Sequence, residues 1–577
     1  MTARDVKPTG KLPLTVLVEM RPALDGFAGI PQETRLLFKG LCLLPSVTVQ
    51  GLLQSSLRFL PAGMLRPRGE AGDAVHEQST SRQALPVPSE DERLGHYSRF
   101  VLTLDSKLSK KPLDMLNRYW HRREAIVKLT IKTLWIPCQR IPLTWFEPLR
   151  FETVVWQVLF AKTLAPQDLP LVTSRNFRVC TVPWNILQSV GLASLKFRAG
   201  RVASYPRLRT AGVDVFISQT PYPGRVDTDT TLVVRYHDAL PVFMSPAFAN
   251  KERHQATHFR ALQANVESGA WFACVSEATR QDLLGLFPEL GERAVTIHNM
   301  VSPHFFDEPS PGHRVRHIMR RRVNTEAPLA RPGFQSLQEQ AAFYARHLGV
   351  VDADEITAQD ASHSDSVDAA TPSKSSTEPL RYLLLVSTIE PRKNHAQLIA
   401  AWEAVRTEHD PALKLVLVGS VGWDVEPILG EMRNWIDRGQ LFVLSGVPAA
   451  DLRVLYRHAA ATVCPSLAEG FDYSGVEAMC SSGLVIASNI PVHREIYADA
   501  AEYFEPYSSD SLVNTLKRVL YDTSAAQVQA KLRAHGKEVS LRYSPAVVLP
   551  RWENFLKHIT GCKEAAVDLS PHFEKTK

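Results

Sequence analysis

Short apolar runs alternate with stretches of helix length between Pro379 and Asp522, and this alternation constrains the fold more than any other feature of the sequence. Such alternation is typical of a parallel sheet that helices cover on both faces. The segment after Asn394 has apolar residues at helical spacing, with Asn394 as a candidate N-cap. The runs expected to form strands are residues 383–386, 415–418, 441–444, 462–464 and 484–487. The sequence therefore predicts a doubly wound α/β domain.

The N-terminal part of the chain repeats this pattern less clearly. At 577 residues and 45% hydrophobic, the chain is longer than one hydrophobic core usually supports, so two or more domains are expected. Strands are predicted at residues 14–18, 213–217, 231–236, 271–275 and 294–297. We expect an N-terminal domain over 1–305 with an insertion at about 60–210, a linker or insertion over 306–379 that is disordered in part, a C-terminal domain over 380–543, and a helix and tail over 544–577 that crosses back to the N-terminal domain.

Charge and cysteine content exclude several classes of protein. The net charge of +6 comes from 66 basic and 60 acidic residues, which is a weak and dispersed excess for a chain that would bind nucleic acid. Seven scattered cysteines without a C-x-x-C pair favour a reducing compartment over a disulfide framework or a structural zinc site. The N-terminus shows no signal peptide pattern, and no run of eighteen apolar residues occurs. We expect a cytoplasmic protein, either soluble or peripheral on the inner face of the cytoplasmic membrane.

The stretch 107–140 differs from the rest of the chain. Nine Lys or Arg residues face only two acids here, and they are interleaved with large apolar residues such as Trp120 and Trp135. Two interpretations remain open. The stretch could bind an anionic membrane surface. The interpretation that we favour is an amphipathic helix that packs its apolar stripe on the N-terminal domain and keeps its lysines in water.

A basic pair follows the first predicted strand of the C-terminal half. The segment from Arg381 to Asn394 consists of a buried strand and a loop that places Arg392 and Lys393 at the start of a helix. In open α/β sheets, ligands bind beyond the carboxyl ends of the strands, where helix-start amides and cations can hold a diphosphate. The alternative is a solvated pair on the surface, which is the usual fate of neighbouring charges.

Two glutamates follow another predicted strand, eight residues apart. If a helix begins near Tyr473, Glu469 lies in the loop before it and Glu477 lies in an early turn, where its two oxygens could accept both hydroxyls of a ribose. Gly470 permits close approach of the backbone, and the amides of residues 471–474 face any anionic group at the helix start. The alternative for Glu477 is stabilisation of the helix dipole alone.

These motifs resemble those of a known family. The string Ser-Thr-Ile-Glu-Pro-Arg-Lys-Asn at 387–394, the Glu-x7-Glu element that starts Glu469-Gly-Phe, and the segment 487–495 are similar to retaining glycosyltransferases of family four. Arg21-Pro22 with Gly29-Ile30 looks like the glycine-containing first loop of this family, and Tyr236-His237-Asp238 looks like its acceptor-side motif. The resemblance covers residues 211–305 and 380–560. It implies an α/β fold of two Rossmann-like domains that face each other across a cleft, called GT-B.

The resemblance also implies roles for individual residues. Arg392 and Lys393 would neutralise the donor diphosphate, Glu477 would hold the ribose, and Glu469 would contact the sugar near the reacting carbon. Asp472 stands where the family often has a small residue, and it could accept a hydrogen bond from a sugar hydroxyl and so select the donor. No metal and no cofactor are implied. The implied catalytic residues are His237, Glu469 and Lys393; the donor-binding residues are Arg392, Lys393, Gly470, Phe471, Asp472, Tyr473, Glu477 and Gly29; the acceptor-side residues are His237 and Asp238.

The motif at 387–394 looks most like that of bacterial mannosyl- and rhamnosyltransferases of surface polysaccharides. This likeness makes GDP-mannose the first expected donor and a saccharide or lipid-linked saccharide the expected acceptor. Three alternatives remain: a nucleotide-sugar epimerase, a phosphorylase of the same fold, and a catalytically silent nucleotide-sugar-binding scaffold in a polysaccharide assembly complex.

Overall fold

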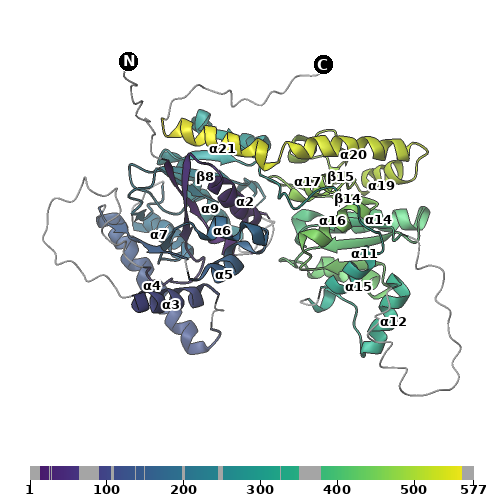
Figure 1. Cartoon of the computed structure of the whole chain (residues 1–577), viewed down its shortest axis with the longest axis horizontal. Helices are drawn as coiled ribbons and strands as arrows, with labels where there is room; N and C mark the ends of the chain where they lie inside the picture. Colours follow the sequence, from purple (N-terminus) through teal and green to yellow (C-terminus); the bar gives the residue numbers. More distant parts are fainter. Residues whose placement is uncertain are drawn as a thin grey trace, which may run out of the picture.

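The computed structural model describes residues 13–63, 90–349 and 379–561, apart from 25, 27–28, 106–108, 137, 149, 198–201, 245–250 and 325–326. Two α/β domains lie next to each other, and two long helices, α20 (Ala525–Leu541) and α21 (Pro545–Ile559), run along one side of both (Figure 1). None of the described helices is both long and apolar enough to cross a bilayer. Residues 64–89 of the expected insertion, residues 350–378 of the expected linker and the tail after residue 561 lie outside the described residues.

The C-terminal domain is built on a six-stranded, fully parallel sheet. Its order is β13-β12-β11-β14-β15-β16, so that the order of the strands, and not their direction, reverses between β11 and β14. Helices α14 (His395–Glu408) and α19 (Ser509–Leu520) pack on one face, and α16 (Ala449–His458) and α17 (Tyr473–Cys480) pack on the other. The strands are β11 (Tyr382–Val386), β12 (Lys414–Val418), β13 (Leu441–Leu444), β14 (Ala461–Cys464), β15 (Val485–Ser488) and β16 (Ala501–Phe504).

The N-terminal domain is built on an eight-stranded sheet with the order β10-β9-β8-β7-β1-β2-β5-β4. All neighbours are parallel except β4, which runs antiparallel to β5 at one edge. The strands are β1 (Leu14–Glu19), β2 (Val47–Leu53), β4 (Leu143–Phe146), β5 (Phe177–Cys180), β7 (Val215–Ser218), β8 (Thr231–Tyr236), β9 (Trp271–Cys274) and β10 (Ala294–Thr296). The main helices are α2 (Ile30–Cys42), α7 (Trp184–Phe197), α9 (Lys251–Glu267) and α10 (Glu277–Leu286).

The stretch 60–210 is partly helical and partly built into this sheet. It contains the long helices α3 (Glu90–Asp105) and α4 (Pro112–Trp135), which lie at the outer edge of the N-terminal domain (Figure 1). It also supplies β4 and β5, whose side chains Phe146 and Phe177 are fully buried in the N-terminal core. The stretch therefore completes the sheet as well as extending it.

The segment expected to be a linker, 306–379, contains two helices within its described residues. Helices α11 (Arg314–Arg322) and α12 (Leu337–Leu348) pack against the C-terminal sheet. Val315, Ile318 and Met319 form the buried stripe of α11, and Asn324 N donates to Val443 O at the sheet edge. These residues belong to the C-terminal domain because they share its core.

Helix α21 crosses from the C-terminal domain to the N-terminal one. Its residues Trp552 and Phe555 are fully buried among N-terminal core residues such as Leu37 and Phe38. Pro550 lies within the helix, which continues on both sides of it. The amphipathic spacing of the apolar residues explains this crossing, since the stripe needs a second hydrophobic surface to cover it.

All ten strands expected from the sequence are present within one or two residues. The sequence analysis did not identify β2, β4, β5 and β16, nor the two-residue strands β3 (Arg140–Ile141) and β6 (Arg207–Leu208), which pair with each other. The expected helix after Asn394 and the helix that begins at Tyr473 are also confirmed as α14 and α17.

Candidate active site

The basic pair and the first glutamate meet at the point where the C-terminal sheet reverses its strand order. Arg392 and Lys393 belong to a short 3-10 turn, Pro391–Lys393, after β11, and Glu469 lies in the loop after the adjacent strand β14. Leu467 N donates to Arg392 O at 3.0 Å, which ties the two loops together. In doubly wound sheets this switch point is where ligands bind.

Glu469 joins both cations. Its Oε2 lies 2.8 Å from Arg392 Nη1, and its Oε1 contacts Lys393 Nζ. A second carboxylate, Glu390, holds Arg392 Nη2 at 2.7 Å. Arg392 Nε is buried and has no hydrogen-bond partner among the described residues. The arginine therefore keeps one N–H that an incoming anionic oxygen could use.

The neighbouring charges favour the ionised forms of Glu469 and Arg392. Burial alone would raise the pKa of Glu469, but the charges of Arg392 and Lys393 hold it below its ordinary value. Burial would likewise lower the pKa of Arg392, and the carboxylates of Glu469, Glu390 and Asp238 raise it instead. A diphosphate at this position would compete with Glu469 for the two cations.

The start of α17 carries an aspartate in an unusual backbone conformation. Asp472 has φ 58° and ψ 94°, a region that side-chain-bearing residues rarely adopt. Its Oδ1 accepts from Ser474 N at 3.2 Å and from Ser474 Oγ at 2.7 Å, and its Oδ2 lies 3.1 Å from His493 Nε2. These bonds lower the pKa of Asp472 against the opposing effect of burial. Both carboxylate oxygens thus already have partners within the protein.

Glu477, one turn into α17, contacts the other domain. Its Oε1 accepts from Gln32 Nε2 of α2 at 2.9 Å, and its Oε2 accepts from Tyr456 OH at 3.1 Å. Burial raises the pKa of Glu477 to about 7, although the two hydrogen bonds act in the opposite direction. The ribose-binding oxygens expected for Glu477 are therefore paired with protein donors in this structure.

A second contact between the domains lies beside the first. Tyr473 OH donates to Glu33 Oε2 at 2.9 Å, and Arg235 Nη2 lies 3.0 Å from Glu33 Oε1. Burial raises the pKa of Glu33, and Arg235 and Tyr473 offset part of that effect. The sequence analysis did not identify Gln32, Glu33 and Arg235. Their positions could have indicated them, because Gln32 and Glu33 follow the Gly29 loop and Arg235 directly precedes the Tyr-His-Asp motif.

His237 and Asp238 follow β8 and approach Gly470 across the domain boundary. A Cβ at Gly470 would lie 1.9 Å from His237 O, so only glycine fits there. His237 Nε2 is buried and has no hydrogen-bond partner among the described residues. Burial, reinforced by Arg235, holds the pKa of His237 well below its ordinary value. Asp238 accepts from Leu240 N at 3.1 Å, and burial raises its pKa.

Gly29 and Phe471 complete the predicted set. Gly29 precedes α2 with φ 69°, a conformation that favours glycine, and its carbonyl accepts from Glu33 N at 3.0 Å. A Cβ at Gly29 would meet nothing within 4 Å. Phe471 is buried, with its ring 5.2 Å from those of Tyr473 and Tyr543.

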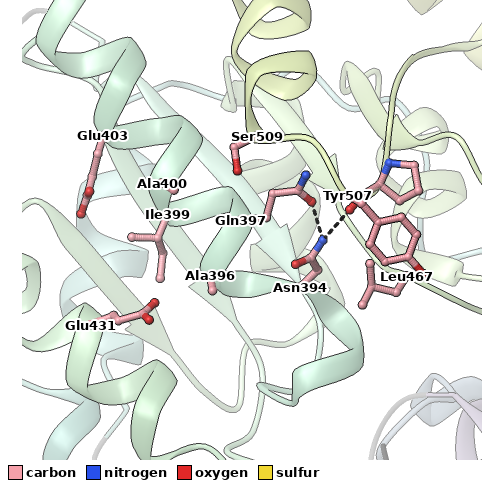
Figure 2. Close-up of a pocket in the computed structure, with 11 residues that line it drawn as sticks. Asn394, Ala396, Gln397, Ile399, Ala400, Glu403, Glu431, Leu467, Tyr507 and Ser509 are labelled. Carbon is pink, nitrogen blue, oxygen red and sulfur yellow. Dashed lines mark hydrogen bonds between the residues drawn. The ribbon is translucent and has the colours of Figure 1, made fainter. Parts of the chain in front are cut away.

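A pocket of about 650 Å³ begins next to these loops. Figure 2 shows Asn394 at its floor, where Nδ2 donates to Pro506 O at 3.1 Å and also contacts Gln397 Oε1. The pocket runs along the outer side of α14 toward Glu403 and Glu431. Its lining residues do not include Arg392, Lys393, Glu469 or Glu477. The charged cluster, rather than this pocket, therefore defines the candidate site.

The structure brings together most of the residues predicted from the motifs. Arg392, Lys393 and Glu469 are in direct contact, whereas the side chain of Glu477 contacts Gln32 and Tyr456 instead. Within the described part of the chain, no group of three or more His, Cys, Asp or Glu side chains is arranged to hold a metal ion. The roles of these residues toward a donor remain predictions.

Part of the chain is similar in sequence to known proteins. Residues 368–539 match the family described as Glycosyl transferases group 1. The O-antigen chain mannosyltransferase B of Escherichia coli is 31% identical over 160 residues, which cover 28% of this chain and 42% of that protein. The serotype-specific mannosyltransferase WbdA of Escherichia coli is 32% identical over 145 residues, or 25% of this chain and 18% of that protein. The chain thus spans less than half the length of these relatives.

Among solved structures, sucrose-phosphate synthase from Thermosynechococcus elongatus has a similar arrangement of the whole chain. The TM-score is 0.51 at 14% sequence identity, and the match covers 95% of this chain and 100% of that one. At this identity the likeness concerns the fold alone. The predicted fold class, two Rossmann-like domains of the GT-B type, is confirmed.

Proposed function

We propose that this chain, whose residues 368–539 are of the group 1 glycosyltransferase type, is a retaining glycosyltransferase that transfers a hexose from a nucleotide-sugar donor to a saccharide or lipid-linked saccharide. The observation that carries the proposal is the contact of Arg392 and Lys393 with Glu469 at the sheet switch point. All three residues lie within the segment that matches the family. The names of the relatives, O-antigen and serotype-specific mannosyltransferases, support mannose as the sugar. GDP-mannose as the donor is proposed from the resemblance of the motif at 387–394.

The chemistry that we propose is mainly electrostatic. When the bond between sugar and diphosphate breaks, negative charge grows on the leaving group and the sugar becomes oxocarbenium-like. Arg392 and Lys393 would stabilise that charge in a buried site, where such interactions are stronger than in water. Because these two cations can balance the diphosphate, we propose that the reaction needs no metal ion and no cofactor.

The roles that we propose for the remaining residues are those implied by the resemblance of the motifs. Glu469, freed from the cations by the diphosphate, would hold hydroxyls of the transferred sugar. Glu477 would exchange Gln32 and Tyr456 for the ribose hydroxyls. His237, with its neutral ring and unpartnered Nε2, would donate to or accept from the sugar or the acceptor hydroxyl, beside Asp238.

The proposal is tested by ligand-induced stabilisation and by transfer. A ligand that binds only the folded protein raises the melting temperature by mass action. We expect GDP to do so more strongly than UDP, ADP or dTDP, and we expect mannose to move from GDP-mannose to a lipid-linked saccharide acceptor with retention at the anomeric carbon, as NMR of the product would record.

Each other outcome has a definite meaning. Stabilisation by a nucleotide without transfer to any acceptor would favour the silent scaffold. Conversion of the donor sugar to its epimer would favour the epimerase. Absence of stabilisation by all four nucleotides would contradict the proposal.

A further inference from the structure

Helix α4 carries an apolar stripe that faces away from the protein. Leu113 is 81% exposed and Trp135 is 80% exposed, although both are large apolar residues. At about 100° per residue, the members of the stripe fall within an arc of roughly 100° on the helix. They are Leu113, Leu116, Trp120, Val127, Ile131 and Trp135, and each is at least half exposed.

The opposite face of α4 is the one that packs on the domain. Helix α4 contacts α7, Leu129 packs against the core cluster that contains Trp184 and Leu187, and Thr130 is buried. The face of α4 that packs on the domain is therefore not the face that carries the exposed stripe. The two alternatives drawn from the sequence are resolved in part, since α4 does pack on the domain but leaves a second apolar face uncovered.

Basic side chains flank the stripe. Lys128 and Lys132 lie on one side of it and Arg123 on the other, at about 100° per residue. Over the whole helix, five Lys or Arg residues stand against Asp114 and Glu124, and Glu124 is paired with Lys128. An apolar stripe with Trp residues and basic flanks is the pattern of helices that lie in the interface of an anionic bilayer.

We propose that α4 docks on a membrane surface with anionic headgroups, with the stripe at the boundary of the acyl chains and Arg123, Lys128 and Lys132 near the phosphates. A second copy of the chain fits less well, because a paired α4 would bring two net basic helices together. Figure 1 shows α4 at the edge of the N-terminal domain opposite α21, so that it can reach a surface without disturbing the crossing helix. The inference goes beyond the proposed function, since it requires no donor.

The test is flotation of the full-length protein with lipid vesicles. We expect binding to vesicles in which roughly one lipid in three is phosphatidylglycerol and much weaker binding to pure phosphatidylcholine, with a decrease at high salt because exposed charges are screened. The triple variant Leu116→Ser, Trp120→Ser and Ile131→Ser should lower the partition coefficient at least about tenfold, since three apolar side chains leave the interface. Lys128→Glu with Lys132→Glu should abolish the preference for anionic lipid.

A matched control removes exposed leucines from the other domain. Leu337 and Leu541 are 76% and 62% exposed, and the double variant Leu337→Ser with Leu541→Ser should float like the wild type. The proposal is overturned if the wild type fails to bind anionic vesicles, or if the triple variant binds them equally well. A concentration-dependent dimer that the triple variant abolishes, without vesicle binding, would assign the stripe to a second copy instead. Melting with GDP in the same samples keeps failure of the proposed function separate, because it requires no lipid.

Discussion

Gln32 of the N-terminal domain donates its side-chain amide to Glu477 of the C-terminal domain, with 2.9 Å between Nε2 and Oε1. The residue expected to hold the donor ribose is thus also a contact between the domains. A donor that engages Glu477 would share this carboxylate with Gln32 and Tyr456 or displace them, so that donor binding and the fit of the two domains are coupled through one side chain.

The raised pKa of Glu477 predicts a pH-dependent stability. Between its ordinary pKa of 4.5 and the folded value of about 7, the unfolded chain loses a proton that the folded protein keeps. The free energy of unfolding therefore falls as the pH rises through this window, by up to about 3 kcal/mol. We expect Glu477→Gln to remove this fall, because Gln32 can turn its amide to accept from the new side chain. Denaturant unfolding at pH 5 and pH 8 measures the difference, with the exposed Glu538→Gln as control. If the free energy of unfolding changed equally between pH 5 and pH 8 in the wild type and in Glu477→Gln, the raised pKa of Glu477 would not be the cause of the fall.

Lys393→Ala and Glu469→Ala should each lose most of the transfer activity. Removing one preorganised charge from such a site costs about two to three decades in turnover. Both variants should remain folded, since Arg392 keeps its bond to Glu390 in either case. The control is Lys531→Ala, which removes an exposed lysine from α20. Turnover near the wild-type value in either variant would remove the basis of the proposed mechanism.

Gly470→Ala tests whether the close approach of the domains is needed. The added Cβ would lie 1.9 Å from the backbone oxygen of His237. Because a backbone atom cannot rotate away as a side chain can, the two domains would have to move apart to remove this clash. Because a misplacement of about 1 Å can cost a hundredfold in rate, we expect transfer to fall by about that factor. Small-angle scattering should show a larger radius of gyration.

The matched control is Gly430→Ala in α15 (Glu426–Asp437), where a Cβ meets nothing within 4 Å. It should stabilise the protein slightly, because alanine favours the helix by up to about 1 kcal/mol. An active Gly470→Ala variant with an unchanged radius would show that the domains tolerate the extra atom.

His237 is expected to act as a neutral side chain. Burial holds its pKa well below the ordinary value of 6.5, so that its ring is uncharged over the pH range from 6.5 upward. His237→Ala should lower kcat/KM without loss of folding, since Nε2 has no partner among the described residues to lose. The ratio of wild-type to variant kcat/KM should stay constant across that range. A change in the ratio of wild-type to variant kcat/KM near pH 6.5 would mean that the His237 ring gains or loses a proton there.

Much of this architecture could be predicted because the sequence signals are local. Buried parallel strands such as β11 and β13 are continuous apolar runs, and loops that follow them carry Lys393 and Glu469 to the same sheet edge. The two loops meet because β11 and β14 are parallel neighbours, and the carboxyl ends of such strands are where ligand sites occur.

The remainder depends on pairings that no single segment contains. Gln32 and Glu477 are 445 residues apart, and nothing in either helix specifies the other. The strands β4 and β5 were missed because a long stretch of helix and loop separates them from β2, which is the neighbour of β5. The exposed stripe of α4 has the same helical period as a packed one, so that the sequence left both interpretations open.

The pair of Asp472 and His493 leads to the last prediction. Asp472 has positive φ and a carboxylate whose oxygens are held by Ser474 and His493, so we expect it to fix the loop that presents Gly470 and Phe471. Because its pKa is lowered, its contribution to stability is present above about pH 4 and is lost as the pH falls through the folded value.

His493→Ala should destabilise the protein by about 3 kcal/mol, since a buried carboxylate loses its partner. Asp472→Asn keeps the bonds to Ser474 and tolerates positive φ, so its cost should be smaller and its donor preference unchanged. Competition between GDP-mannose and other nucleotide sugars measures that preference, and denaturant unfolding measures the stability. A shift of preference in Asp472→Asn would instead mean that the aspartate leaves His493 to bind a sugar hydroxyl, as its place in the motif suggests.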